Sequence, residues 1–89
     1  TSWISIGLVH GNIAKTANYY FNTGSVGHGA YMISNDGYTW HHHTSSLNSF
    51  YNSFSFQQGD TVVMTANPKT KVLKFFKETN PDHSYELNF

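Results

Sequence analysis

Three consecutive histidines, His41-His42-His43, are the residues of this chain best suited to chemistry. On a β-strand, His41 and His43 point the same way, about 6.5–7 Å apart, because each residue rises about 3.3 Å. Two such imidazoles could share a zinc ion, with His28 and Asp36 as the nearest further ligands. A structural zinc takes four protein ligands, and the chain has no cysteine and no second ligand motif. We therefore expect no metal and no cofactor, with His42 packed among aromatic rings and His41 and His43 exposed at a strand end.

Other catalytic patterns in the chain are weak. Residues 23–29 read TGSVGHG, but the strand-like residues 30–33 follow where a phosphate-binding loop needs a helix. Serine, histidine and aspartate are all present, yet there is no G-x-S-x-G motif and the five acidic residues are scattered. The sequence therefore predicts a protein that is not an enzyme and has no catalytic residues.

The composition narrows the class of partner. The 89 residues suffice for one domain, and aromatic residues make up 17% of them. Five lysines balance five acidic residues and there is no arginine, which argues against nucleic acid and against electrostatic membrane docking. No apolar run approaches the ~20 residues of a membrane helix. The absence of cysteine and of Asn-X-Ser/Thr sequons favours the cytoplasm.

The elements that position these residues are short strands. Ala30–Ser34 alternates as a strand, Asn35-Asp36-Gly37 is a tight turn, and Tyr38 opens the second strand of a hairpin. Apolar residues on both faces of Trp3–His10 predict a central strand, in which Gly7 marks a close approach. Further segments are assigned by pattern: Ile13–Ala17 as a possible helical turn, Asn18–Phe21 as a possible edge strand, Thr44–Ser53 as a long exposed loop, and Phe54–Phe56, Thr61–Ala66, Lys71–Lys77 and His83–Phe89 as strands. Six or seven short strands predict an all-β antiparallel sandwich.

Several of these segments, in order, resemble the SPRY domain family. The matching pieces are Trp3-Ile4-Ser5-Ile6-Gly7-Leu8, Gly37-Tyr38-Thr39-Trp40, the Gly59-Asp60-Thr61-Val62 strand start, Leu73-Lys74-Phe75-Phe76, and Tyr85-Glu86-Leu87-Asn88-Phe89. The likeness spans nearly all of residues 1–89 but only the later two-thirds of a typical family domain. It implies a sandwich of SPRY (concanavalin-like) type that lacks its opening strands. Because the chain starts at Thr1 rather than Met, we expect a single domain, or a domain fragment, of a longer polypeptide.

The resemblance implies a protein–protein interaction module in which loops at one edge of the sandwich bind a segment of a partner protein. From the residues themselves, interfaces favour Tyr, because it offers a large contact area at low entropic cost. The predicted partner-binding residues are Asn35, Asp36, Tyr38, His41 and His43, with Thr44–Ser53 as a mobile rim.

Two other functions stay open at this point. One is a carbohydrate-binding sandwich, in which Trp40 stacks on a sugar ring. The other is an architectural piece that completes a sheet in a multi-chain assembly, because an incomplete sandwich leaves strand edges unpaired.

Overall fold

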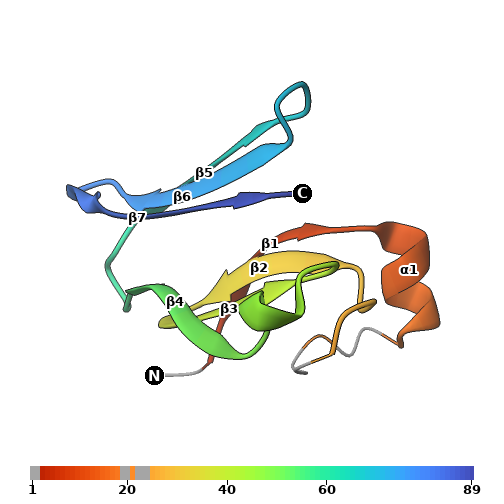
Figure 1. Cartoon of the computed structure of the whole chain (residues 1–89). Helices are drawn as coiled ribbons and strands as arrows, with labels where there is room; N and C mark the ends of the chain where they lie inside the picture. The colour runs from red at the N-terminus through yellow and green to blue at the C-terminus, as the bar shows by residue number, and fades with distance from the viewer. Residues whose placement is uncertain (1–2, 19–20, 22–24) are drawn as a thin grey trace.

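The chain folds into two antiparallel sheets, one above the other (Figure 1). The computed structural model describes residues 3–18, 21 and 25–89. Sheet A has the order β1-β2-β3-β4 and sheet B the order β5-β6-β7. The strands are β1 (Ser5–Val9), β2 (Ala30–Ser34), β3 (Asp36–His41), β4 (Phe50–Ser55), β5 (Val62–Asn67), β6 (Val72–Lys77) and β7 (Asn80–Asn88), with the helix α1 (Gly11–Thr16) and the 3-10 helix η1 (Ser45–Leu47). The prediction of an all-β, sandwich-like fold is confirmed.

The main core lies between the sheets. Its buried members come from both layers: Tyr31, Ile33 and Phe54 from sheet A, and Leu73, Phe75 and Leu87 from sheet B. Their period of two along β2, β6 and β7 is what places them on one face. Burying these large side chains is the main favourable term that holds two small sheets together.

A second, smaller cluster covers the other face of sheet A. Ala30, Met32 and Trp40 are buried there, and Phe21 packs against them. The ring of Trp3 meets that of Trp40 edge to face at 5.6 Å. Both faces of sheet A are therefore apolar near β2, which explains why all five residues of that strand are buried.

The strand that was predicted to be central, Trp3–His10, lies at an edge. Among the described residues β1 pairs with β2 alone. Its two apolar faces pack against different clusters. Ile6 and Leu8 pack on the main core, while Trp3 on the other face packs on Trp40. The predicted close approach at Gly7 is confirmed, since a Cβ there would lie 2.0 Å from the Tyr31 carbonyl oxygen.

The predicted hairpin is present and is formed by β2 and β3. Gly37 adopts a φ of 88°, which favours glycine. A Cβ at this position would also lie 2.2 Å from the Tyr51 ring. The Ser34 hydroxyl donates a hydrogen bond to the Asp36 carboxylate and accepts one from the Tyr38 backbone N–H. Glycine is thus required twice at this turn, for its backbone angle and for the ring packed on it.

Two predicted segments differ in detail. Thr44–Ser53 is not one long loop, because it contains η1 and the first four residues of β4. The helical turn expected at Ile13–Ala17 is present as α1. The edge strand considered for Asn18–Phe21 lies largely outside the described residues. Within the described part of the chain, none of the helices has the length and apolar character needed to cross a bilayer.

Candidate functional site

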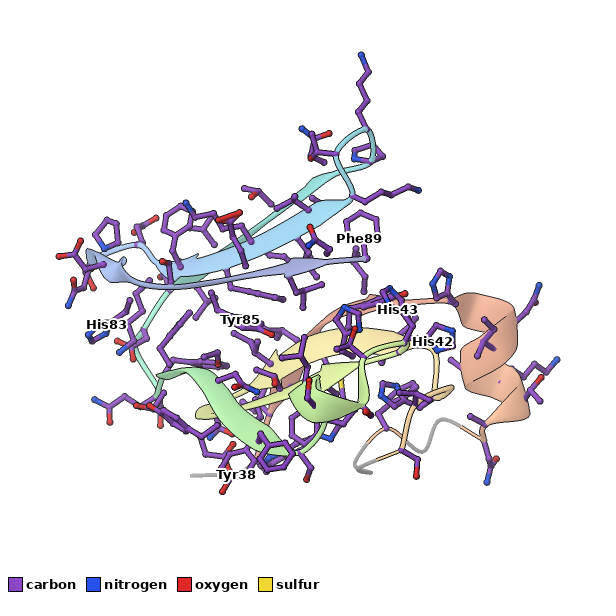
Figure 2. All side chains as sticks on the ribbon, viewed as in Figure 1. Tyr38, His42, His43, His83, Tyr85 and Phe89 are labelled. Atoms are coloured by element: carbon purple, nitrogen blue, oxygen red, sulfur yellow. The ribbon has the colours of Figure 1, made fainter. Side chains whose placement is uncertain are left out.

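The five residues predicted to bind a partner are spread along β3 and the residues on either side of it. Asn35 lies between β2 and β3, and Asp36 is the first residue of β3. Figure 2 shows Tyr38 on the face of sheet A that points away from sheet B, whereas His43 lies beyond the end of β3. The predicted residues therefore do not form one contiguous surface.

His41 is buried and not exposed as the sequence suggested. Its side chain is 2% exposed, and its Nε2 lies 2.5 Å from the backbone carbonyl oxygen of Asn88 at the end of β7. Burial, more than the neighbouring histidines, lowers the pKa of His41. His43 is exposed, and its ring stands edge to face on that of His41 at 4.3 Å. In this state His41 joins the two sheets and cannot contact a partner.

A hydrogen-bond network fixes the rings of His28 and His42 at the same end of the molecule. His28 and His42 each accept a backbone N–H at Nδ1, from Ala30 and from Gly29 respectively. The other nitrogen of His28 bonds to the amide oxygen of Asn48 at 2.7 Å. Because Nδ1 is an acceptor, the proton of each ring lies on Nε2.

Asn48 joins this network to β3. Its amide oxygen also accepts the backbone N–H of His41 at 3.0 Å, and its amide nitrogen donates to the carbonyl oxygens of His41 and Thr44. The side chain is almost completely buried. Hydrogen bonding of this kind is what buried polar groups need, so the network serves the fold.

The histidines do not form a metal site in the described residues. No group of three or more His, Asp or Glu side chains there is arranged to hold an ion. The Nδ1 lone pairs of His28, His41 and His42 are already engaged by backbone N–H groups. The pKa of His42 is lowered, first by burial and then by His10 and the neighbouring histidines.

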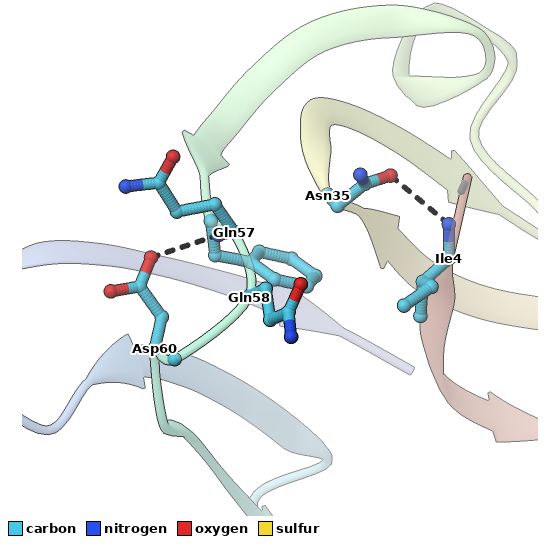
Figure 3. Close-up of a pocket in the computed structure, with 7 residues that line it drawn as sticks. Ile4, Asn35, Gln57, Gln58 and Asp60 are labelled. Atoms are coloured by element: carbon cyan, nitrogen blue, oxygen red, sulfur yellow. Dashed lines mark hydrogen bonds between the residues drawn. The ribbon is translucent and has the colours of Figure 1, made fainter. Parts of the chain in front are cut away.

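One surface hollow lies at the loop edge of the sandwich (Figure 3). This loop-edge hollow has a volume of ≈ 520 Å³ and is lined by Ile4, Asn35, Phe56, Gln57, Gln58, Gly59 and Asp60. The Asn35 amide oxygen accepts the Ile4 N–H, and the Asp60 carboxylate accepts the Gln57 N–H at 2.8 Å. Asp60 also pairs with Lys77 at 3.4 Å, and its pKa is lowered, chiefly by the Gln57 N–H. The Asn35 amide oxygen and the Asp60 carboxylate of the loop-edge hollow are thus already bonded to other groups of the same chain.

A second hollow lies beside β3 and β4 and is rich in exposed aromatic rings. This aromatic hollow has a volume of ≈ 670 Å³. Tyr38, Phe50 and Tyr51 line it and are 40%, 58% and 60% exposed. Its polar lining consists of Ser46, Ser49 and Asn52. No charged side chain lines it, so an uncharged, partly apolar ligand suits it best.

Strand pairing fixes the geometry of the aromatic hollow. Tyr38 and Tyr51 are direct cross-strand partners, and their rings meet at an angle of 83° with centroids 6.3 Å apart. The pairing shifts register between Asp36 and Tyr38, the kind of irregularity that re-aims a side chain next to a site. Ser49, just before β4, has a φ of 62°. The two tyrosine rings therefore form a corner and not a flat platform.

Of the residues of the aromatic hollow, the sequence pointed to Tyr38 as a contact and to the rest as an unstructured rim. Phe50 and Tyr51 were missed because they follow a run rich in serine and asparagine. Two adjacent aromatics in such a polar stretch are a signal that could have been used, since large apolar groups are costly to expose without a purpose. Trp40, considered as a sugar platform, is 2% exposed and cannot stack on a ligand.

Comparison of the chain with protein-family models, with curated proteins and with solved structures finds no match. The geometry of the two hollows therefore carries the functional argument.

Proposed function

We propose that this chain is a non-enzymatic interaction module, of the kind the SPRY resemblance implies, that binds a segment of a partner protein in the aromatic hollow. The observation that carries the proposal is the pair of exposed tyrosines, Tyr38 and Tyr51, whose rings meet beside a concavity that Phe50 also lines. Protein interfaces are enriched in Tyr and Phe at their centre, and a few such anchors supply most of the binding energy.

The corner between two of the rings favours a polypeptide over a sugar. Tyr38 and Tyr51 stand nearly perpendicular, which suits an apolar side chain inserted between them better than a flat sugar face. Ser46, Ser49 and Asn52 at the rim can exchange hydrogen bonds with the backbone of a bound segment. The preferred segment is uncharged at its centre, because the hollow has no charged lining to pair with it.

The cellular setting that we propose rests on the absence of cysteine. A module that needs no disulfide suits the reducing cytoplasm, and the chain has no cysteine. We propose that it acts there as one part of a larger protein or assembly, with its specificity set by the side chains around Tyr51.

Selection of displayed random peptides against the purified chain tests this proposal. Tyr51→Ala should weaken the selected peptides by about tenfold or more, equivalent to about 1.4 kcal/mol. Met64→Ala, an exposed apolar side chain on β5, is the matched control and should leave binding unchanged. Circular dichroism of each variant confirms that the fold is kept.

Two outcomes contradict the proposal. One is that the selected peptides bind Tyr38→Ala, Phe50→Ala and Tyr51→Ala as tightly as the unaltered chain. The other is that no peptide is selected while soluble oligosaccharides bind and lose affinity on Tyr51→Ala, which would assign the hollow to carbohydrate.

A further inference from the structure

The outer edge of β1 offers unpaired backbone groups. On its inner side, Asn35 N donates to Ile4 O at 2.9 Å and His10 N donates to Gly29 O at 2.7 Å. In an antiparallel ladder, residues that bond to the neighbouring strand alternate with residues that do not. The even-numbered residues from 4 to 10 therefore bond to β2. The N–H and C=O groups of Ser5, Gly7 and Val9 point away from it, where the described residues provide no strand.

This edge lacks the usual protection against pairing. Residues 3–10 contain no Lys, Arg, Asp or Glu and no proline, which are among the devices that keep natural edges apart. Trp3, Ile4 and Val9 are 49%, 49% and 55% exposed along it. By contrast β7, at one edge of sheet B, carries Pro81, Asp82 and Glu86. The edge of β1 thus combines free hydrogen-bonding groups with exposed apolar surface.

We propose that β1 pairs antiparallel with β1 of a second copy of this chain, about a two-fold axis through Gly7. The pairing joins two copies of sheet A into one continuous eight-stranded sheet. Gly7 then faces Gly7 of the partner subunit, and Ser5 faces Val9 of the partner subunit. The apolar pair of Ile6 and the partner subunit's Leu8 lies on the core side of the joined sheet, because residues directly opposite share a face.

A second copy is favoured over another extended chain by symmetry and charge. Ser5 and Val9 lie two residues on either side of Gly7. A two-fold rotation about Gly7 therefore brings the outward N–H groups of one copy opposite the outward C=O groups of the other. Glycine on the axis also adds no side chain that could collide with its counterpart in the other copy. No like charges meet in this register, since all facing residues are uncharged. Strand pairing alone covers less than the roughly 1,200 Å² of a stable interface, so we expect a weak, concentration-dependent dimer.

Sedimentation of the purified chain over a range of concentrations tests the pairing. We expect reversible dimers that Val9→Pro weakens by at least about tenfold. Proline at this position removes one outward N–H from each copy and leaves the bonds from β1 to β2 intact, as edge prolines do. Val9→Thr keeps the N–H and the branched side chain and is the matched control. A monomer at all concentrations, or equal dimerisation of Val9→Pro and Val9→Thr, overturns the proposal.

Cysteine pairing tests the register. The chain has no cysteine, so Ser5→Cys and Val9→Cys chains each carry one thiol. Facing residues in a hydrogen-bonded antiparallel pair have Cα atoms about 5.5 Å apart, within the range of a disulfide. A mixture of the two variants should cross-link faster than either alone, and cross-linking of Ser5→Cys with itself at the same rate would overturn the register. Because Val9 does not line the aromatic hollow, peptide binding by Val9→Pro separates this inference from the proposed function.

Discussion

Sheets A and B solve the problem of an exposed face in different ways. Of the ten Lys, Asp and Glu side chains, eight lie between residues 60 and 86, around sheet B, and only Lys15 and Asp36 precede them. The outer face of sheet B is solvent-exposed and carries charged cross-strand pairs such as Lys74 opposite Glu86. The outer face of sheet A instead carries Trp40, Met32 and the rings of Tyr38 and Tyr51.

Under the proposed function, sheet A is the layer that contacts a partner and sheet B is the layer that supports it. Sheet A has the uncharged edge at β1, both faces apolar, and a buried polar network at the end of β3. Sheet B has one buried face and a charged surface of the kind that needs no partner.

The largest effect is expected where the two sheets share a core. Phe75 on β6 is fully buried between them, so Phe75→Ala should lower the free energy of unfolding by about 3–5 kcal/mol. Its neighbour Lys74, exposed on the outer face of sheet B, is the control, and Lys74→Ala should stay within about 0.5 kcal/mol. Urea unfolding measures both. If Phe75→Ala cost no more than Lys74→Ala, the sheets would not depend on a common core.

A smaller effect, confined to sheet A, is expected from the polar network. Asn48→Ala leaves the His28 ring N–H and the His41 backbone N–H without their buried acceptor, at a cost of about 1–3 kcal/mol. Asn12 is exposed on α1, so Asn12→Ala removes the same side-chain amide from a site that is not buried and should change the free energy of unfolding little. Hydrogen exchange adds a local readout, because amides near the end of β3 should lose protection while those of β6 keep it. Equal loss in both sheets would show that the network is not local to sheet A.

Local pattern was enough to predict much of this fold, but not which elements become neighbours. Apolar residues alternate with charged ones in Leu73-Lys74-Phe75 and in Tyr85-Glu86-Leu87, and this pattern predicts that the apolar residues face one core. An edge strand and a central strand read alike when both faces are apolar, so the position of β1 was predicted wrongly. His41 was expected at the surface because its acceptor, the Asn88 carbonyl, lies 47 residues away. Phe50 and Tyr51 were missed because the polar run before them was interpreted as a loop, whereas they begin β4 and pair with β3.

The subtlest test of the contrast between the sheets is the response to acid, which should act through sheet A. The pKa values of His41 and His42 are lowered in the folded chain, first by burial and then by nearby histidines that include His28 and His43. The unfolded chain therefore binds more protons than the folded chain once the pH falls below the ordinary histidine value of about 6.5. The stabilising contribution of these rings is complete above that pH and is lost as the pH falls through their lowered folded-state pKa.

The hydrogen bonds give this acid response its structural cause. At Nδ1, His41 accepts the His43 N–H and His42 accepts the Gly29 N–H, so a proton added there sets donor against donor. Urea midpoints measured from pH 8 down to pH 5 should fall, and His41→Gln should flatten the fall. His83→Gln, which removes an exposed histidine of sheet B, should leave the fall in place. An unchanged midpoint over this range, or a fall that His83→Gln abolishes, would show that the buried histidines of sheet A do not govern stability in acid.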